Sequence, residues 1–150
     1  MNLTEQIDSA IKEAMKAKDA LRLETLRMVK SALKYTIIET KGPDGKAEDA
    51  DVIATIRKQI KMRQDTLASF AQGGRTDAGD NERREISILE AFLPAQMSAE
   101  ELETIVKSTL TEIGATSKKQ MGDAMKAVMA KVAGRAESRA ISTLVGKFLN

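Results

Sequence analysis

Apolar residues recur at helical spacing along the whole chain, and no stretch alternates long enough to predict a β-strand. The first helix begins with Asn2 and Glu5, which have the spacing of a capping box. One apolar stripe follows within it, made up of Leu3, Ile7, Ile11, Ala14 and Met15. The pattern predicts an all-α protein, with an N-terminal helical bundle of about four helices followed by a small three-helix C-terminal domain.

The second predicted helix is apolar over an unusually wide arc. Asp19 is suited to cap its start, and its main stripe runs Leu23, Leu26, Val29, Leu33 and Ile37. Four further residues widen that stripe, namely Leu21, Met28, Ala32 and Tyr35. A helix that is apolar over so wide an arc is predicted to be the central helix of its bundle.

Two more helices are predicted before a boundary. Residues 50–71 carry Ile53, Ile56, Ile60, Leu67 and Phe70 at core spacing, and Gly73-Gly74 ends that helix. Residues 76–93 form the next, which should stop at Leu93 because Pro94 disfavours helix in the residue before it. The junction near 94–98 divides the chain into an N-terminal domain, 1–95, and a C-terminal domain, 96–150.

The C-terminal domain shows the starts and stops of three helices. Ser98 with Glu101, and Ser117 with Gln120, have capping-box spacing, while Gly114 and Gly134 suit helix ends. The apolar positions of the middle helix are Met121, Met125, Val128, Met129 and Val132.

The composition of the chain excludes several kinds of catalytic and metal-binding site. Cysteine and histidine are both absent, which excludes thiolate metal sites, disulfides and cysteine nucleophiles and removes the commonest general base. No apolar run approaches the roughly 18 residues of a membrane span, and the first residues lack the pattern of a signal peptide. We therefore expect a cytoplasmic protein with no catalytic residues, no cofactor, no metal and no membrane partner.

Other chemical motifs are weak. The acidic residues Asp44, Glu48, Asp49 and Asp51 lack calcium-loop spacing and suit a helix start. Ser31 and Lys34 match an SxxK pattern without its companion motifs. The third helix is basic, and we interpret its charges as structural. Four residues are expected to form a cross-helix ion-pair network, namely Arg63, Asp65, Arg75 and Glu85.

Charge is distributed unevenly although the net charge is only +2. Residues 1–93 are neutral and residues 94–113 are acidic, whereas residues 114–150 hold seven bases and two acids. A basic cluster of this kind is either a solvated surface or a nucleic-acid footprint. The candidate nucleic-acid-binding residues are Lys118, Lys119, Lys126, Lys131, Arg135 and Arg139, of which Lys131 and Arg135 are expected to be central.

Several segments resemble the GatB/YqeY family, in order and over nearly the whole chain. They are Arg22–Ala32, Lys58–Asp65 with Phe70, Gly74–Asp77, Glu85–Gln96, Met121-Gly122 and Lys131–Ala136. The Leu93-Pro94-Ala95-Gln96 and Gly134-Arg135-Ala136 segments are the more specific of these. Glu137 departs from the family pattern, which has Asn or Asp after the second segment.

The resemblance implies a free-standing YqeY-like protein, similar to the C-terminal tail of the GatB component of the tRNA-dependent amidotransferase. The resemblance implies the enzyme class of the carbon–nitrogen ligases that use glutamine as amido-N-donor. The catalytic parts of the amidotransferase are not in this chain, so the resemblance does not imply that this chain carries out the reaction. The favoured function is a tRNA-binding accessory module in an amidotransferase or aminoacyl-tRNA synthetase complex, with no DNA binding. The alternative is a helical protein–protein adaptor that binds no nucleic acid. An enzyme acting through lone carboxylates and lysines is the third hypothesis.

Overall fold

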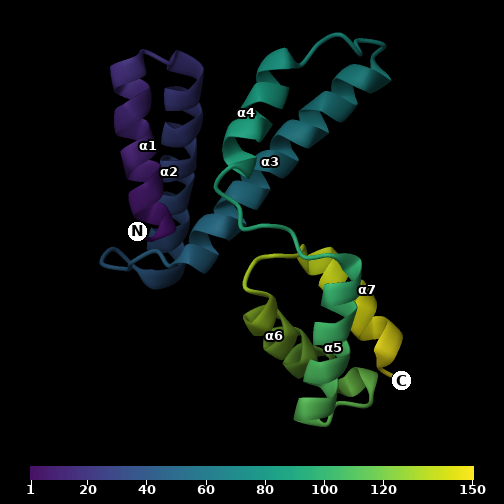
Figure 1. Ribbon diagram of the computed structural model, residues 1–150. Helices are drawn as coiled ribbons and strands as arrows, with labels where there is room; N and C mark the ends of the chain where they lie inside the picture. The colour runs from purple at the N-terminus through teal and green to yellow at the C-terminus, as the bar shows by residue number, and fades with distance from the viewer. The chain divides into compact units, whose positions relative to one another are not determined.

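The computed structural model describes residues 1–150 and contains helices but no strand (Figure 1). The predicted all-α class is confirmed. The elements are α1 (Leu3–Ala17), α2 (Ala20–Lys41), α3 (Asp49–Gln72), α4 (Asp80–Glu90), α5 (Ala99–Ile113), the short 3₁₀-helix η1 (Lys118–Gln120), α6 (Met121–Val132) and α7 (Ser138–Phe148). None of these helices combines the length and the apolar character needed to cross a lipid bilayer.

The chain divides into two compact units, Met1–Leu93 (unit 1) and Pro94–Asn150 (unit 2). This division lies two residues before the expected one. Residues 95–97 belong to unit 2 because the Met97 amide donates to the Arg135 carbonyl at 2.8 Å, and Arg135 Nε donates to the Ala95 carbonyl at 3.1 Å. That each unit folds independently stays a prediction.

Unit 1 is built from two helical hairpins, α1 with α2 and α3 with α4 (Figure 1). Helix α2 joins them, since it packs against α1, α3 and α4. The core of this unit consists of Ile7, Val29, Leu33, Ile37, Val52, Ile56, Ile60 and Leu89. The capping box of Asn2 and Glu5 forms at the start of α1 as predicted.

Helix α2 is the central helix of unit 1, as predicted, because it packs against α1, α3 and α4. Its wide apolar arc, however, is not buried all round. Its main stripe is buried through Leu26, Val29 and Leu33, but Met28 and Tyr35 are exposed. The buried residues of α2 form one stripe, so the widened apolar arc reaches beyond what the other helices bury.

Helix α4 begins four residues later than the sequence predicts. Gly79 precedes it with φ of +100°, a left-handed conformation that favours glycine. A Cβ at this position would meet Leu67 Cδ2 at 2.3 Å, so the Leu67 side chain would have to shift to admit any other residue. The helix ends at Glu90, three residues before the predicted end at Leu93. The restriction that Pro94 places on Leu93 therefore does not decide where α4 stops.

Unit 2 packs α5, α6 and α7 around a separate core. The residues of this core are Leu102, Val106, Leu110, Ala115, Ala124, Val128, Val132, Ile141, Val145 and Leu149. Ser98 caps α5 by accepting from the Glu101 amide, and Gly114 ends it with φ of +69°. The Ser117–Gln120 capping box forms, but it opens η1 rather than α6 itself. Of the predicted apolar positions of α6, Met129 is exposed.

Candidate nucleic-acid interface

The six candidate cations lie on η1, α6, α7 and the turn between α6 and α7, all in unit 2. Lys118 and Lys119 are on η1, Lys126 and Lys131 on α6, and Arg139 is in the first turn of α7. Arg135 lies in the turn between α6 and α7. All are exposed except Arg135, which is half-buried. The structure therefore keeps the six in one small unit but gives them different surroundings.

Lys131 is already paired. Its ammonium group forms an ion pair with the Glu112 carboxylate, from the last turn of α5. Both side chains are largely exposed, so the pair contributes little to stability, on the order of 0–1 kcal/mol. A phosphate that reached Lys131 would have to compete with this carboxylate.

Arg135 joins the α6–α7 turn to the segment that precedes α5. In addition to the bond from Nε to the Ala95 carbonyl, Nη2 lies 3.4 Å from Glu101 Oε2 on α5. Because its own carbonyl accepts from the Met97 amide, this one residue ties the α6–α7 turn to the segment that precedes α5. Two of the five N–H donors of its guanidinium are thus committed within the fold.

The other four cations are free. The side chains of Lys118, Lys119, Lys126 and Arg139 form no ion pair or hydrogen bond within the chain. Cations without an internal partner can bind a phosphate without breaking an ion pair of the fold, at the cost of hydration and side-chain freedom. These four are the better-placed members of the candidate set.

The helix starts of unit 2 differ in the amides they offer to an anion. Before η1, the amides of Thr116 and Ser117 are satisfied by Gln120 Oε1, at 2.8 and 3.2 Å. At α7, the Glu137 side chain makes no capping hydrogen bond, so the first-turn amides stay open beside Arg139. The Glu137 carboxylate stands at the same helix start and opposes an anion there.

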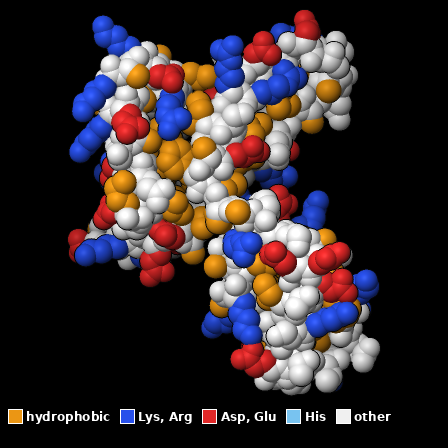
Figure 2. Space-filling view, viewed as in Figure 1, with side chains coloured by type: hydrophobic (Ala, Val, Ile, Leu, Met, Phe, Trp, Pro, Cys, Tyr) orange, Lys and Arg blue, Asp and Glu red, His pale blue; other side chains and the backbone are white.

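The basic segment is offset by acids within unit 2. Four of the unit's six acidic residues lie on α5, namely Glu100, Glu101, Glu103 and Glu112. Two of these make the ion pairs with Arg135 and Lys131. Figure 2 shows acidic and basic side chains interspersed over the visible face rather than gathered into one large basic area. Unit 2 therefore offers an anion a few free cations and not a strong overall positive field.

The predicted ion-pair network in unit 1 is confirmed in part. Arg63 Nε lies 2.6 Å from Glu85 Oε2, linking α3 to α4. Asp65 is exposed and lies near Lys61 at 3.8 Å, and Arg75 stacks over the Phe70 ring at 5.1 Å. Asp65 and Arg75 do not join the network, because their side chains leave the α3–α4 contact and face solvent.

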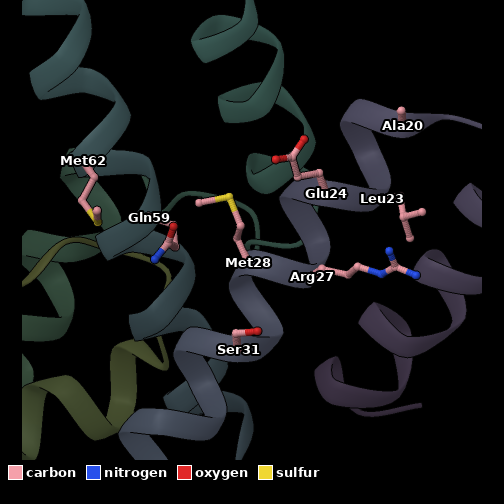
Figure 3. Close-up of a pocket in the computed structure, with 8 residues that line it drawn as sticks. All are labelled: Ala20, Leu23, Glu24, Arg27, Met28, Ser31, Gln59 and Met62. Carbon is pink, nitrogen blue, oxygen red and sulfur yellow. The ribbon is translucent and has the colours of Figure 1, made fainter.

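A pocket that the sequence reasoning missed lies on α2 and α3 of unit 1. It is an open hollow of about 670 Å³ (Figure 3), lined by Ala20, Leu23, Glu24, Arg27, Met28, Ser31, Gln59 and Met62. The wide apolar arc of α2 was the signal that could have revealed it. The structure contains no group of three His, Cys, Asp or Glu side chains that could hold a metal.

Comparison with known proteins gives a consistent result. A family model described as Yqey-like protein matches residues 4–149. A relative from Kluyveromyces lactis, named "Altered inheritance of mitochondria protein 41, mitochondrial", is 35% identical over 105 residues, covering 69% of this chain and 56% of that protein. A protein of the same name from Lachancea thermotolerans is 32% identical over 127 residues, covering 82% of this chain and 66% of its own length.

The matched part of the chain thus spans less than two thirds of these relatives. Their names place them in mitochondria and assign no ligand or reaction. The cytoplasmic location expected for this chain stays a prediction.

Proposed function

This chain belongs to the YqeY-like family, and from that premise we propose that it is an accessory module that binds the phosphate backbone of RNA, with tRNA as the favoured ligand. The observation that carries the proposal is the set of four free cations on η1, α6 and α7. Lys131 and Arg135 become supporting residues, because each already has a carboxylate partner.

The composition of the interface indicates what kind of recognition it performs. Phe148 is the only aromatic residue of unit 2, and its ring is covered by the ammonium groups of Lys107 and Lys147 at 5.0 and 5.6 Å. A base that stacked on this ring would have to displace both ammonium groups. Binding would therefore read the shape and backbone of a folded RNA rather than its sequence.

The proposal assigns no reaction to the chain. The resemblance to the tail of the amidotransferase's GatB component supports a role in a complex that acts on aminoacyl-tRNA, either an amidotransferase or a synthetase. In such a complex this module would hold the tRNA body while another protein carries out the chemistry.

Titration of the full chain with bulk tRNA at several salt concentrations tests the proposal. The variant lacking all four free cations, with Lys118, Lys119, Lys126 and Arg139 changed to Ala, should bind more weakly. Each lost phosphate contact should also lower the slope of log K against log salt by about 0.7–0.9. A control variant, Lys12→Ala with Lys16→Ala, removes exposed cations from α1 of unit 1. Equal losses per charge in both variants, or binding that does not respond to salt, would overturn the proposal.

A further inference from the structure

The strongest unexplained feature of the molecule is an apolar surface on α2 and α3. Half of the eight exposed large hydrophobic residues of the chain gather there. Met28, Tyr35 and Ile38 share one face of α2 at spacings of seven and three residues, and are 46%, 72% and 46% exposed. Met62 on α3 is 52% exposed and lines the same pocket as Met28. We call these four residues the methionine face.

A buried cation, Arg63, holds two of the residues that line the pocket, Gln59 and Met28. In Figure 3, Met28 extends from α2 toward α3, where Gln59 and Met62 lie. Arg63 Nη2 donates to the Met28 sulfur at 3.7 Å, and Nη1 donates to the Gln59 carbonyl and Oε1 at 2.9 and 3.0 Å. Thioether sulfur is a weak acceptor, so Arg63 Nη2 is poorly satisfied by this contact.

Cations outnumber acids around the methionine face, although Glu24 lines the pocket and Glu39 and Asp65 lie close to Ile38 and Met62 in the sequence. Residues 20–38 of α2 hold four cations and one acid, Glu24, and residues 55–63 of α3 hold four cations and no acid. Three of these cations are exposed and have no ion-pair partner, namely Arg27, Lys34 and Lys58. Lys58 is four residues from Met62, and Lys34 is seven from Arg27, so each lies along a face that borders the pocket.

The exposed methionines and the unpaired cations beside them indicate what kind of partner would bind the methionine face. We propose that the methionine face binds an acidic amphipathic helix of a partner protein, whose apolar residues cover Met28 and Met62 and whose carboxylates approach Arg27, Lys34 and Lys58. Flexible thioether side chains suit a helix laid into a groove. A second copy of this chain is disfavoured because it would bring two basic surfaces together. RNA would use the cations but would leave the exposed methionines without a partner.

The test uses the full chain with ¹³C-methyl methionine and a designed peptide as probe. The peptide is an 18-residue helix with Leu at the i, i+3, i+4 and i+7 positions and Glu on the flanks, and its control has Lys in place of Glu. The acidic peptide should shift the methyl signals of Met28 and Met62 in a saturable way. Two exposed methionines outside the face, Met15 and Met129, should not move. Shifts at all four, or equal binding of the Lys peptide, would reduce the result to general apolar contact and overturn the proposal.

Matched variants give a second measurement by fluorescence anisotropy. Met28→Ala should weaken binding of the acidic peptide about tenfold, while Met15→Ala should leave it unchanged. Arg27→Glu with Lys58→Glu should weaken it more than Lys12→Glu with Lys16→Glu. If tRNA, and not the peptide, shifts Met28 and Met62, the face is an RNA surface and the partner-helix proposal is wrong. Because the free cations of the proposed RNA interface lie in unit 2, failure of either proposal leaves the other standing.

Discussion

Arg63 Nε on α3 donates to Glu85 Oε2 on α4 at 2.6 Å, and the two side chains are only 8% and 22% exposed. This is the most buried ion pair of the chain. The Arg63 guanidinium also donates to Gln59 and to Met28, and it thereby links the α3–α4 hairpin to α2. The pair therefore connects the two hairpins of unit 1 at the base of the methionine face.

Removing one partner of this pair should destabilise unit 1 strongly. Arg63→Ala leaves the Glu85 carboxylate in a poorly hydrated site, which is expected to cost about 3–5 kcal/mol and to lower Tm by on the order of 10 °C or more. Thermal unfolding followed by circular dichroism measures this. Lys61→Ala is the control, since Lys61 is exposed and only loosely paired. An unchanged Tm for Arg63→Ala would refute a structural role for the pair.

The ion pair between Lys41 and Asp51 should make stability depend on pH. Lys41 Nζ donates to Asp51 Oδ2 at 2.8 Å. This bond, helped by the Glu48 amide, holds the pKa of Asp51 below its ordinary value of 3.8, and it raises the pKa of Lys41 above 10.5. The carboxylate's contribution is complete above pH 3.8 and is lost as the pH falls through its folded pKa. The ammonium's contribution is complete below pH 10.5 and is lost as the pH rises through its folded pKa.

Urea unfolding across the pH range tests this expectation. Asp51→Asn should be less stable than the parent chain near neutral pH, and the difference should shrink as the pH falls below about 4. Asp44→Asn is the control. It changes an exposed carboxylate in the segment between α2 and α3, and this variant should be as stable as the parent chain. A stability difference for Asp51→Asn that persisted undiminished at pH 2 would contradict the assignment.

The core of unit 2 contains one unsatisfied hydroxyl. Thr109 is fully buried on α5 and its Oγ1 has no hydrogen-bond partner. Thr109→Val keeps the shape and removes the desolvated hydroxyl, so the free energy of unfolding should rise by about 1 kcal/mol. Thr104→Val on the same helix loses an exposed bond to the Glu100 carbonyl and should not stabilise. A loss of stability on Thr109→Val would show that the hydroxyl does have a partner.

Limited proteolysis should cut the chain at the junction of the two units. Few long-range bonds hold residues 94–98, and those that do depend on Arg135. Proteinase K at low ratio should release fragments ending near this segment, and Arg135→Ala should speed the cut. The Arg139→Ala variant, which lacks a free cation on α7, is the control and should be cleaved at the parental rate. Cleavage confined to the interior of residues 1–93 would argue against two separable units.

Local features of this fold could be predicted from the sequence because short-range physics determines them. The capping bonds of Asn2 and Ser98 join residues three apart, and the buried positions Leu26, Val29 and Leu33 follow the helical repeat. A cap and a stripe depend on neighbours within one or two turns, which the chain order supplies directly.

Other features depended on which helices meet. Whether Met28 and Tyr35 are buried depends on how much of α2 the other helices cover, and periodicity alone does not specify that. Lys131 and Arg135 looked like free phosphate ligands because their partners, Glu112 and Glu101, are 19 and 34 residues away. The sequence by itself determined the helices and located the basic segment. Only the tertiary structure decided which cations are free and which apolar side chains lack cover, because both depend on contacts between residues far apart in the chain.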